Sequence, residues 1–461
     1  MFDLLISNCT VFGREGSDAI GINEGRIAFI GIDRDLRAKK RIDLSGKIVF
    51  PGFIDSHAHL LSTGLEDIRL NLYHTKSKEE VVERIAEYSK GKEKVIAYRW
   101  DESMWKPQSS YLTSSDINGI PVPVVAFRRD GHMAVANQKA MDVIGTTRKE
   151  GIFKEDDIEL LEPLVKPNEA EIRDALNTAA NRAISLGIVA VRDMVDISTY
   201  NEYKNIKTPL KIYKVLYSDS IFDKFGTSSQ NDWGIKAFLD GSLGSRTAAH
   251  KGWDASNLKM DESKFENFAK QIWMHNLPLA VHAIGEVAVE TAAKVFYRNA
   301  GRNRNSIEHF ELVDDDVLDY ITKTTIISSQ PNFLEWAGKG GMYEDRVGGE
   351  WLYKNNPFRW MIDRGIHLAF GSDSMPIGPM YGIYYAVNSE YQRQKITLEE
   401  AVRCYSEGGS YLLGTEGYMG MLRVGYSADM AVFDEKLLKD LRGIKAAKPE
   451  ITIINGKIYT N

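Results

Sequence analysis

Two histidines two residues apart close an apolar run at residues 51–60. If this run forms a β-strand, His57 and His59 point to the same face, because side chains i and i+2 of a strand share a face. Two convergent neutral imidazoles are typical ligands of Zn²⁺ and similar divalent ions. On this motif alone, two unrelated surface histidines are the alternative.

Further residues of metal-ligand type follow in regular order. His282 and His309 are 27 residues apart, the length of one strand–helix unit, and His309 and Asp373 are 64 apart, the length of two. Each residue alone could belong to a core, but strand ends on one face of a barrel are where barrel enzymes do chemistry. The shared register therefore predicts one site, whose further members are Lys236, His282, His309 and Asp373.

Strands alternate with helices through the middle of the sequence. Helices are predicted at residues 169–186, 263–275, 287–299, 315–322 and 398–413, the last opening with a Thr397/Glu400 capping box. Eight strands with intervening helices favour an α/β fold of the (β/α)₈ TIM barrel type over an open sheet. The strands are predicted at residues 48–54, 188–192, 210–216, 235–239, 279–282, 306–309, 325–329 and 367–371.

The two ends of the chain consist of short strands and turns instead. We predict that they pair into one small β-sandwich, with a hairpin at Asn455-Gly456 between two apolar runs. The predicted strands are residues 3–11, 19–22, 26–32, 47–50, 428–433, 451–454 and 457–459.

These patterns predict two domains. Residues 1–50 and 415–461 form the sandwich, and residues 51–414 form the barrel domain. The segment from about residue 66 to residue 162 is longer than one strand-to-strand connection needs. We expect it to form an insertion at the mouth of the barrel that acts as a partial lid. An insertion that faces away from the site is the alternative.

Composition limits the partners. The 461 residues carry 58 basic and 64 acidic side chains, a net charge of −6, so broad attraction to nucleic acid is not expected. The only cysteines, Cys9 and Cys404, fit a reducing compartment, and no apolar run is long enough for a membrane span. We predict a cytoplasmic protein with a small-molecule substrate, no nucleic-acid or membrane partner, and the option of a homodimer.

The chain resembles the amidohydrolase superfamily, specifically the amidohydrolase-3 branch that includes N-substituted formamide deformylases. One departure is Glu286, where the branch would have aspartate. The resemblance spans nearly the whole chain and is carried by residues 53–59, 100–105, 128–132, 236–246, 282–285, 307–309 and 371–373.

The resemblance implies a divalent metal site, most simply two Zn²⁺ per chain, with one ion as the alternative. In the superfamily, a lysine at the position of Lys236 is commonly carboxylated and bridges two ions. Burial would make the neutral amine needed for this reaction accessible. An ammonium that binds substrate or pairs with Asp240 is the other option. The implied ligands are His57, His59, Lys236, His282, His309 and Asp373.

The ligand types predict a metal-bound hydroxide, and the resemblance implies that it hydrolyses a C–N bond, in an amide, N-formyl or N-acyl compound. Asp373 would be the general base and acid, which takes the proton of the water and passes it to the leaving nitrogen. The alternatives are a mononuclear deaminase of a cyclic amidine or purine-like ring and a catalytically silent scaffold.

Substrate contacts are predicted less directly. His132 and the backbone near Ser242 and Leu243 are candidate donors to the oxyanion. Arg129 and Arg246 could clamp a substrate carboxylate, or could pair with Asp130 and Asp240 instead. The predicted substrate-binding residues are His132, Arg129, Trp100, Ser242, Leu243, Arg246 and Asn332.

Overall fold

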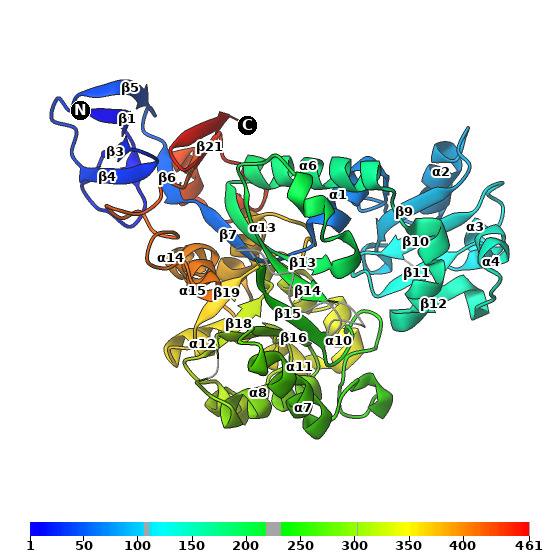
Figure 1. The fold of residues 1–461 in the computed structure, drawn as a ribbon. Coiled ribbons are helices and arrows are strands. Elements are labelled where there is room, and N and C mark those ends of the chain that lie inside the picture. The colour runs from blue at the N-terminus through cyan, green and yellow to red at the C-terminus, as the bar shows by residue number, and fades with distance from the viewer. Residues whose placement is uncertain (106–109, 218–231, 302, 461) are drawn as a thin grey trace.

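A computed structural model describes residues 1–105, 110–217, 232–301 and 303–460, and its centre is a barrel of eight parallel strands (Figure 1). Neighbouring strands pair in chain order, and the backbone N–H of Asp373 donates to the carbonyl of His57 at 2.7 Å, which joins the last strand's end to the first. The predicted (β/α)₈ fold is confirmed. Its strands are β7 (Phe53–Ala58), β13 (Ile188–Asp196), β14 (Lys211–Tyr217), β15 (Asp232–Phe238), β16 (Leu279–Ala283), β17 (Asn305–His309), β18 (Thr325–Ser329) and β19 (Leu368–Phe370).

Helices cover the outside of the barrel because each has one apolar face. In α6, Ala175, Ala179 and Ala183 recur every four residues and are fully buried. Gly64 lets α1 approach α6, since a Cβ there would lie 1.8 Å from the carbonyl oxygen of Ala175. The main outer helices are α1 (Leu60–Ile68), α6 (Glu169–Ser185), α7 (Glu262–Met274), α8 (Glu286–Arg298), α12 (Phe358–Asp363) and α13 (Pro379–Asn388).

Four predicted elements differ from the structure. The strand expected at residues 3–11 is two strands, β1 (Phe2–Ser7) and β2 (Thr10–Val11), which belong to different sheets. The strand expected at residues 48–54 is two strands, β6 (Ile48–Pro51) and β7, because the chain leaves one sheet for the other at Gly52. The helix expected at residues 315–322 is a 3-10 helix, η8 (Asp315–Tyr320). The helix expected at residues 398–413 is interrupted by a π-helical turn. It consists of α14 (Leu398–Arg403), the π-helical segment η10 (Cys404–Gly408) and α15 (Gly409–Leu413).

The two chain ends form two further sheets that enclose a small core of their own, at the left in Figure 1. One sheet joins both ends, because β6 pairs antiparallel with β20 and places Val49 opposite Val432. The predicted hairpin is present, with Asn455 and Gly456 both at positive φ. The sheets have the orders β4-β3-β1-β5 and β2-β6-β20-β21-β22. Their strands are β1 (Phe2–Ser7), β2 (Thr10–Val11), β3 (Ala19–Asn23), β4 (Arg26–Gly31), β5 (Ala38–Asp43), β20 (Met430–Phe433), β21 (Ile451–Ile454) and β22 (Lys457–Thr460).

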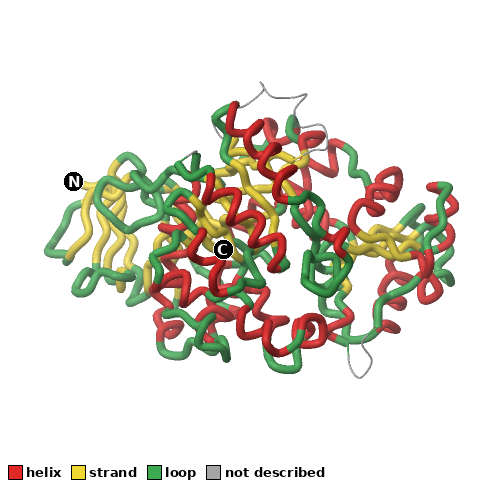
Figure 2. The backbone as a smooth tube through the Cα atoms, turned by 90° about the horizontal axis from the view of Figure 1, so that it is seen from below, coloured by secondary structure: helices red, strands yellow, loops and turns green. Residues whose placement is uncertain are grey.

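The insertion after β7 contains a separate five-stranded sheet, the lobe at the right of Figure 1. The tube in Figure 2 shows the same division into a terminal lobe, the barrel and the insertion. The first long helix of the insertion is capped by Ser77, whose hydroxyl accepts from the backbone N–H of Glu80. The elements are β8 (Leu70–Asn71), α2 (Lys78–Tyr88), β9 (Val95–Trp100), α3 (Ser114–Ile117), β10 (Val124–Arg128), β11 (Met133–Ala136), α4 (Gln138–Ile144), β12 (Ile152–Lys154) and α5 (Glu162–Val165).

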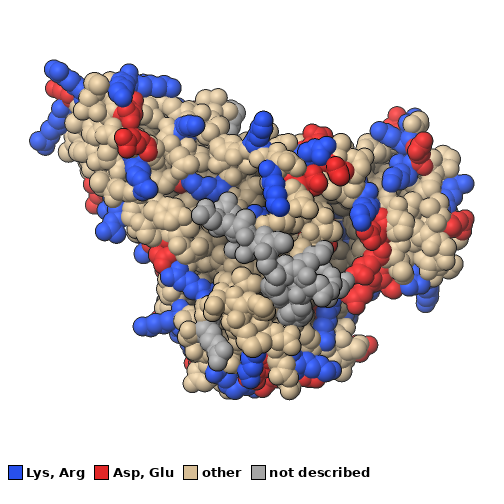
Figure 3. Space-filling view, viewed as in Figure 1, with Lys and Arg blue, Asp and Glu red and all other residues tan. Residues whose placement is uncertain are grey.

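Basic and acidic side chains intermix on the face shown in Figure 3. Among the described residues, no helix combines the length and the apolar character that crossing a membrane requires. The domain limits at residues 1–50 with 415–461, and at 51–414, stay a proposed division.

Candidate metal centre and catalytic cavity

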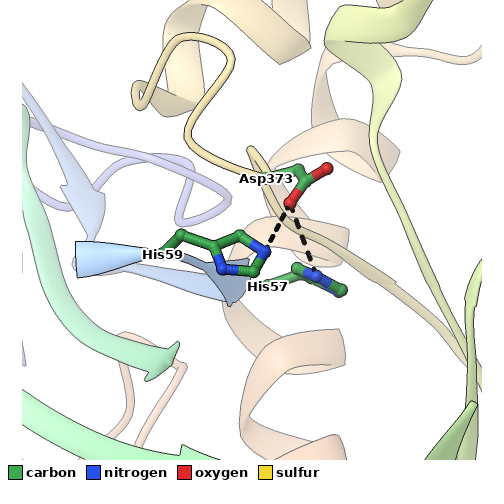
Figure 4. A group of neighbouring side chains, drawn as sticks. All are labelled: His57, His59 and Asp373. Carbon is green, nitrogen blue, oxygen red and sulfur yellow. Dashed lines mark ion pairs between the residues drawn. The ribbon is translucent and has the colours of Figure 1, made fainter. Parts of the chain in front are cut away.

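His57, His59 and Asp373 form a compact group at the carboxyl ends of β7 and β19 (Figure 4). One ligand atom from each side chain lies within 4.8 Å of the others. The Oδ1 atom of Asp373 is 3.0 Å from Nε2 of His59 and 3.5 Å from Nε2 of His57. The structure therefore brings together three predicted ligands, although Asp373 is more than 300 residues from either histidine in the sequence.

A buried carboxylate fixes Asp373 beside the two histidines. Asp55 accepts from the backbone N–H of Ser372 at 2.9 Å, from the Ser372 hydroxyl at 2.6 Å and from the backbone N–H of His57 at 3.2 Å. Burial raises the pKa of Asp55 to about 6 in spite of these bonds. Asp373 and Ser374 both adopt positive φ, 49° and 59°, a conformation that non-glycine residues hold only when their surroundings require it.

The ring of His57 is oriented from inside the barrel. Its Nδ1 lies 2.6 Å from Oε2 of Glu308. Glu308 in turn accepts two hydrogen bonds from the guanidinium of Arg192, at 2.9 and 3.1 Å. Burial raises the pKa of Glu308, but the Arg192 guanidinium outweighs it and holds the pKa below its ordinary value. An ionised Glu308 can only accept, so Nδ1 of His57 carries the proton and Nε2 presents a lone pair toward Asp373.

The donor set fits a divalent cation. Burial lowers the pKa of His57, His282 and His309 well below the ordinary value, so all three imidazoles are neutral, which is the ligand form. His309 is 2 % exposed, and neither of its ring nitrogens makes a hydrogen bond of ordinary geometry among the described residues, although the Gln330 side chain lies near enough to raise its pKa. Buried polar atoms in proteins are nearly always paired, and a metal ion would take one of the two nitrogens, because a neutral imidazole offers a single lone pair.

Lys236 lies next to this group, with its Nζ 3.1 Å from Nε2 of His57. Burial lowers the pKa of Lys236 to about 8, although Asp373 and Glu308 oppose the shift. Within the described residues Lys236 forms no salt bridge, and Asp240 instead accepts from the backbone N–H groups of Ala249 and Gly285. The pairing of Lys236 with Asp240 is therefore absent here.

His282 and His309 form a second group beside the first. Their ring centroids are 4.4 Å apart, and the His309 ring is 4.9 Å from that of His57. His282 Nε2 lies 3.0 Å from the carbonyl oxygen of Gly241, which leaves its Nδ1 as the ligand atom. All six predicted ligands thus lie at one end of the barrel.

A cavity of about 30 Å³ adjoins His282, His309 and Asp373, which leaves room for only one or two water molecules. Met342 and Met375 line it, and their unbranched side chains can change rotamer when a larger molecule binds. The insertion contributes Arg128, Asp130 and His132 to its wall. The other lining residues are Ser242, Leu243, Gly244, Ile284, Glu311, Phe333, Trp336 and Tyr343.

Three of the predicted substrate contacts line this cavity: His132, Ser242 and Leu243. His132 Nδ1 is 3.0 Å from Glu155. Burial alone would lower the pKa of His132, but the Glu155 carboxylate outweighs burial and raises the pKa to about 9. The ring can therefore donate from Nε2. The hydroxyl of Ser242 donates to Asp130 at 3.1 Å.

The other four predicted contacts have different surroundings. Trp100 is fully buried in the insertion and donates from Nε1 to the carbonyl of Ala126. Arg246 is exposed, 5.9 Å from the Trp253 ring. Asn332 donates to two backbone carbonyls, those of Ser372 and Met375, and so holds the segment that carries Asp373.

Arg129 joins the insertion to the barrel rather than facing the cavity. It pairs with Glu335 at 2.6 Å and lies between the rings of Tyr73 and Trp336, at 4.6 and 4.5 Å. The neighbouring Arg128 pairs with Asp130 instead, at 2.6 Å. Of the two proposed clamps, Arg129 is therefore paired with Glu335, and Arg246 is exposed and does not line the cavity.

The sequence interpretation missed the charged residues inside the barrel. Arg192 and Glu308 were visible as opposite charges within two otherwise buried strands, which is the signal that could have found them. Glu311, just beyond His309, is 1 % exposed, and burial raises its pKa to about 8. Its only signal was its distance of two residues from a ligand.

An eight-stranded parallel barrel with side chains of metal-ligand type at the carboxyl ends of its strands is the arrangement in which metal-dependent barrel hydrolases place their active sites. The model of the amidohydrolase family matches residues 40–459. The chain belongs to this family.

Individual relatives agree with this assignment. An uncharacterized metal-dependent hydrolase from Pyrococcus furiosus has a similar structure, with a TM-score of 0.76, 26 % identity, and coverage of 95 % of this chain and 99 % of that one. Protein LONG AFTER FAR-RED 3 of Arabidopsis thaliana is 25 % identical over 99 % of this chain and 91 % of its own length. The N-substituted formamide deformylase of Arthrobacter pascens is 23 % identical over 94 % of both chains.

Proposed function

We propose that this enzyme hydrolyses a non-peptide C–N bond in an amide, N-formyl or N-acyl compound. The observation that carries the proposal is the position of Asp373, whose carboxylate is shared between two ligand histidines and also lines the cavity. The similarity to a formamide deformylase over 94 % of both chains supports the choice of bond.

The six predicted ligands would hold the metal, and a divalent cation supplies an acidified water and a polarised carbonyl when bound. Asp373 takes a proton at its carboxylate from the attacking water and delivers it to the leaving nitrogen. Its neighbours lower the pKa of Asp373 against the effect of burial, so the carboxylate is ionised and ready to accept. His132 donates from Nε2 toward the carbonyl oxygen as negative charge develops there.

We propose that the site would hold two Zn²⁺ ions and that Lys236, once carboxylated, would supply oxygen ligands to both. The amine forms an N–C bond to CO₂ and loses a proton, and burial favours the neutral amine that this reaction needs. The distance of 3.1 Å between Nζ of Lys236 and Nε2 of His57 places the amine next to a ligand.

The Lys236→Ala variant is expected to lose hydrolysis by about a thousandfold and to regain part of it with a short-chain carboxylic acid, which restores two oxygen ligands. Metal content and turnover would be measured with and without the acid. Lys294→Ala, at a lysine of the outer helix α8 that pairs with Glu290, is the control and should keep full activity. Full activity of Lys236→Ala would exclude the bridging role.

Metal content per chain, measured by elemental mass spectrometry on protein purified without chelators, tests the proposed function first. We expect about two equivalents of metal, loss of activity on chelation and its return with Zn²⁺. A panel of N-formyl, N-acyl and lactam compounds then identifies the bond. Protein that stays metal-free after Zn²⁺ is supplied would contradict the proposal.

A mononuclear deaminase of a cyclic amidine or purine-like ring is the second candidate. The compact group of only three side chains, His57, His59 and Asp373, favours it, because three ligands suit a single ion. About one equivalent of metal and release of ammonia from such rings would decide for this activity. For either activity, we propose that the enzyme is located in the cytoplasm, with a homodimer as an option for its assembly.

A further inference from the structure

A second cavity, of about 390 Å³, adjoins the loop that follows Asp373. Met375 lines the catalytic cavity, and the next three residues, 376–378, line the second one. One short stretch of chain is therefore shared by the two cavities. The volume of the second cavity falls within the range of small-molecule sites in proteins.

The charged side chains in the wall of the second cavity are all basic. Arg99 stands at the end of β9, Arg182 on α6, and Lys445 on η12 (Ile444–Ala446), with Lys448 just beyond it. The insertion, the barrel and the C-terminal segment thus each contribute positive charge. In a chain with a net charge of −6, such a gathering of one sign favours an anionic ligand.

The acids behind the wall do not balance this charge. Arg129, which is not in the wall, shares one carboxylate with Lys445, so five basic groups face three acids. Among the described residues, Lys448 has no hydrogen bond or salt bridge. The three acids, none of which lines the cavity, are Glu66, Asp67 and Glu335.

Arg99 connects the second cavity to the catalytic loop. Its Nη2 donates to the backbone carbonyl of Ser374 at 2.5 Å, one residue from Asp373. Its Nε faces Glu66, and a guanidinium has five N–H groups, so donors remain for a ligand. Asp373 and Ser374 hold positive φ only because their surroundings require it, and Arg99 is part of those surroundings.

The rest of the wall is largely apolar. Leu186, Ile377 and Met380 line it, together with the rings of Tyr73 and Tyr381. Basic groups beside an apolar surface suit a molecule that has an acidic group on an apolar or aromatic body.

We propose that the second cavity is an effector site for a small organic anion, a carboxylate or phosphate on an apolar body. The acidic group pairs with the basic side chains of the wall, and the body packs against residues 376–378. The bound anion holds Arg99 against Ser374 and so fixes the loop of Asp373 in its catalytic position. Binding of the anion is independent of the proposed hydrolysis, whereas the activation that follows rests on it.

Calorimetric titration of the Zn²⁺-loaded full chain with phenyl phosphate and benzoate, against the neutral benzamide, tests the site. We expect both anions to bind about tenfold or more tightly than benzamide, and the tighter anion identifies the acidic group. The double variant Lys445→Gln/Lys448→Gln should raise the Kd of the anions about tenfold. Ala446→Trp fills the cavity without changing its charge and should raise the Kd at least as much.

Lys436→Gln is the matched control, because it removes an exposed lysine of the same C-terminal segment, on η11 (Glu435–Leu438), that does not line the cavity. It should bind the anions as the wild type does. An equal Kd in the wild type and in both cavity variants would mean that the probes bind elsewhere, such as at the metal centre, and would overturn the proposal.

Turnover at saturating substrate, where competition for the metal centre is suppressed, tests the effector role. With the tighter anion bound we expect kcat for an N-formyl compound to rise about fivefold in the wild type and to stay unchanged in both cavity variants. A wild-type kcat that stays constant or falls while the anion binds would overturn this role. If no formamide is hydrolysed, the proposed function is wrong, but a Kd that rises about tenfold in the cavity variants still supports the anion site.

Discussion

Replacement of Asp373 by asparagine is expected to lower kcat for C–N bond hydrolysis by about a thousandfold or more. The asparagine keeps the size of the side chain and the backbone bond from the N–H of Asp373 to the carbonyl of His57. It loses the carboxylate that takes the proton of the water and returns it to the leaving nitrogen. The main effect should therefore appear in kcat rather than in KM.

Metal content must be measured in the same protein preparation, because Asp373 is also a predicted ligand. A variant that holds the wild-type amount of metal and is still inactive assigns the loss to proton transfer. Asp363→Asn, at an exposed acid of α12 paired with Arg359, is the matched control and should be fully active. Turnover of Asp373→Asn within about tenfold of the wild type would exclude Asp373 as the general base.

The barrel and its six candidate ligands could be predicted because both depend on local patterns. An apolar run that ends in His57 and His59, or in His282, marks the carboxyl end of a strand wherever that strand lies in the barrel. The positions in sequence then follow from the length of a strand–helix unit. The break at Gly52 was not predictable in this way, since the apolar pattern runs through it from β6 to β7.

The insertion and the substrate contacts could not be predicted to the same depth. Its strands β8, β11 and β12 have two to four residues, too few to show an alternating pattern. Nothing in the sequence distinguishes Arg128 from its neighbour Arg129, yet Arg128 lines the cavity and Arg129 pairs with Glu335. Which arginine faces the site depends on the packing of the insertion against the barrel, and packing is not encoded in spacing.

The pair of Arg192 and Glu308 shows the same limit inside the barrel, since the two residues are 116 positions apart on separate strands. Ser306 and Glu308 point inward because they alternate along β17, whereas His309 reaches the cavity through its positive φ of 69°. Two successive residues therefore serve one site, one as a candidate ligand and one as a positioning residue for His57. Only the register of the strands reveals this relation.

The Glu308→Gln variant is expected to have the largest combined effect on stability and metal affinity. Arg192 stacks on Trp233 at 4.0 Å and would keep a buried charge without a carboxylate, which should lower the free energy of unfolding by about 3–5 kcal/mol. His57 would lose the carboxylate that fixes its tautomer, because the glutamine amide donates as well as accepts, so metal affinity should fall about 10–100-fold. Urea unfolding of the metal-free protein and Co²⁺ titration followed by visible absorption measure the two effects separately.

The double variant Arg192→Met/Glu308→Gln separates positioning from folding. Removal of the unpaired guanidinium should return part of the lost stability, because replacing a buried ion pair by apolar groups is often tolerated. It should not return metal affinity, since Nδ1 of His57 still lacks a carboxylate. Arg304 and Glu416 form a partly exposed pair at 2.6 Å, and Glu416→Gln should cost only about 0–1 kcal/mol with no change in Co²⁺ binding. If Glu308→Gln bound Co²⁺ as tightly as the wild type, Glu308 would be a structural residue alone, and the orientation of His57 would have to come from the strand itself.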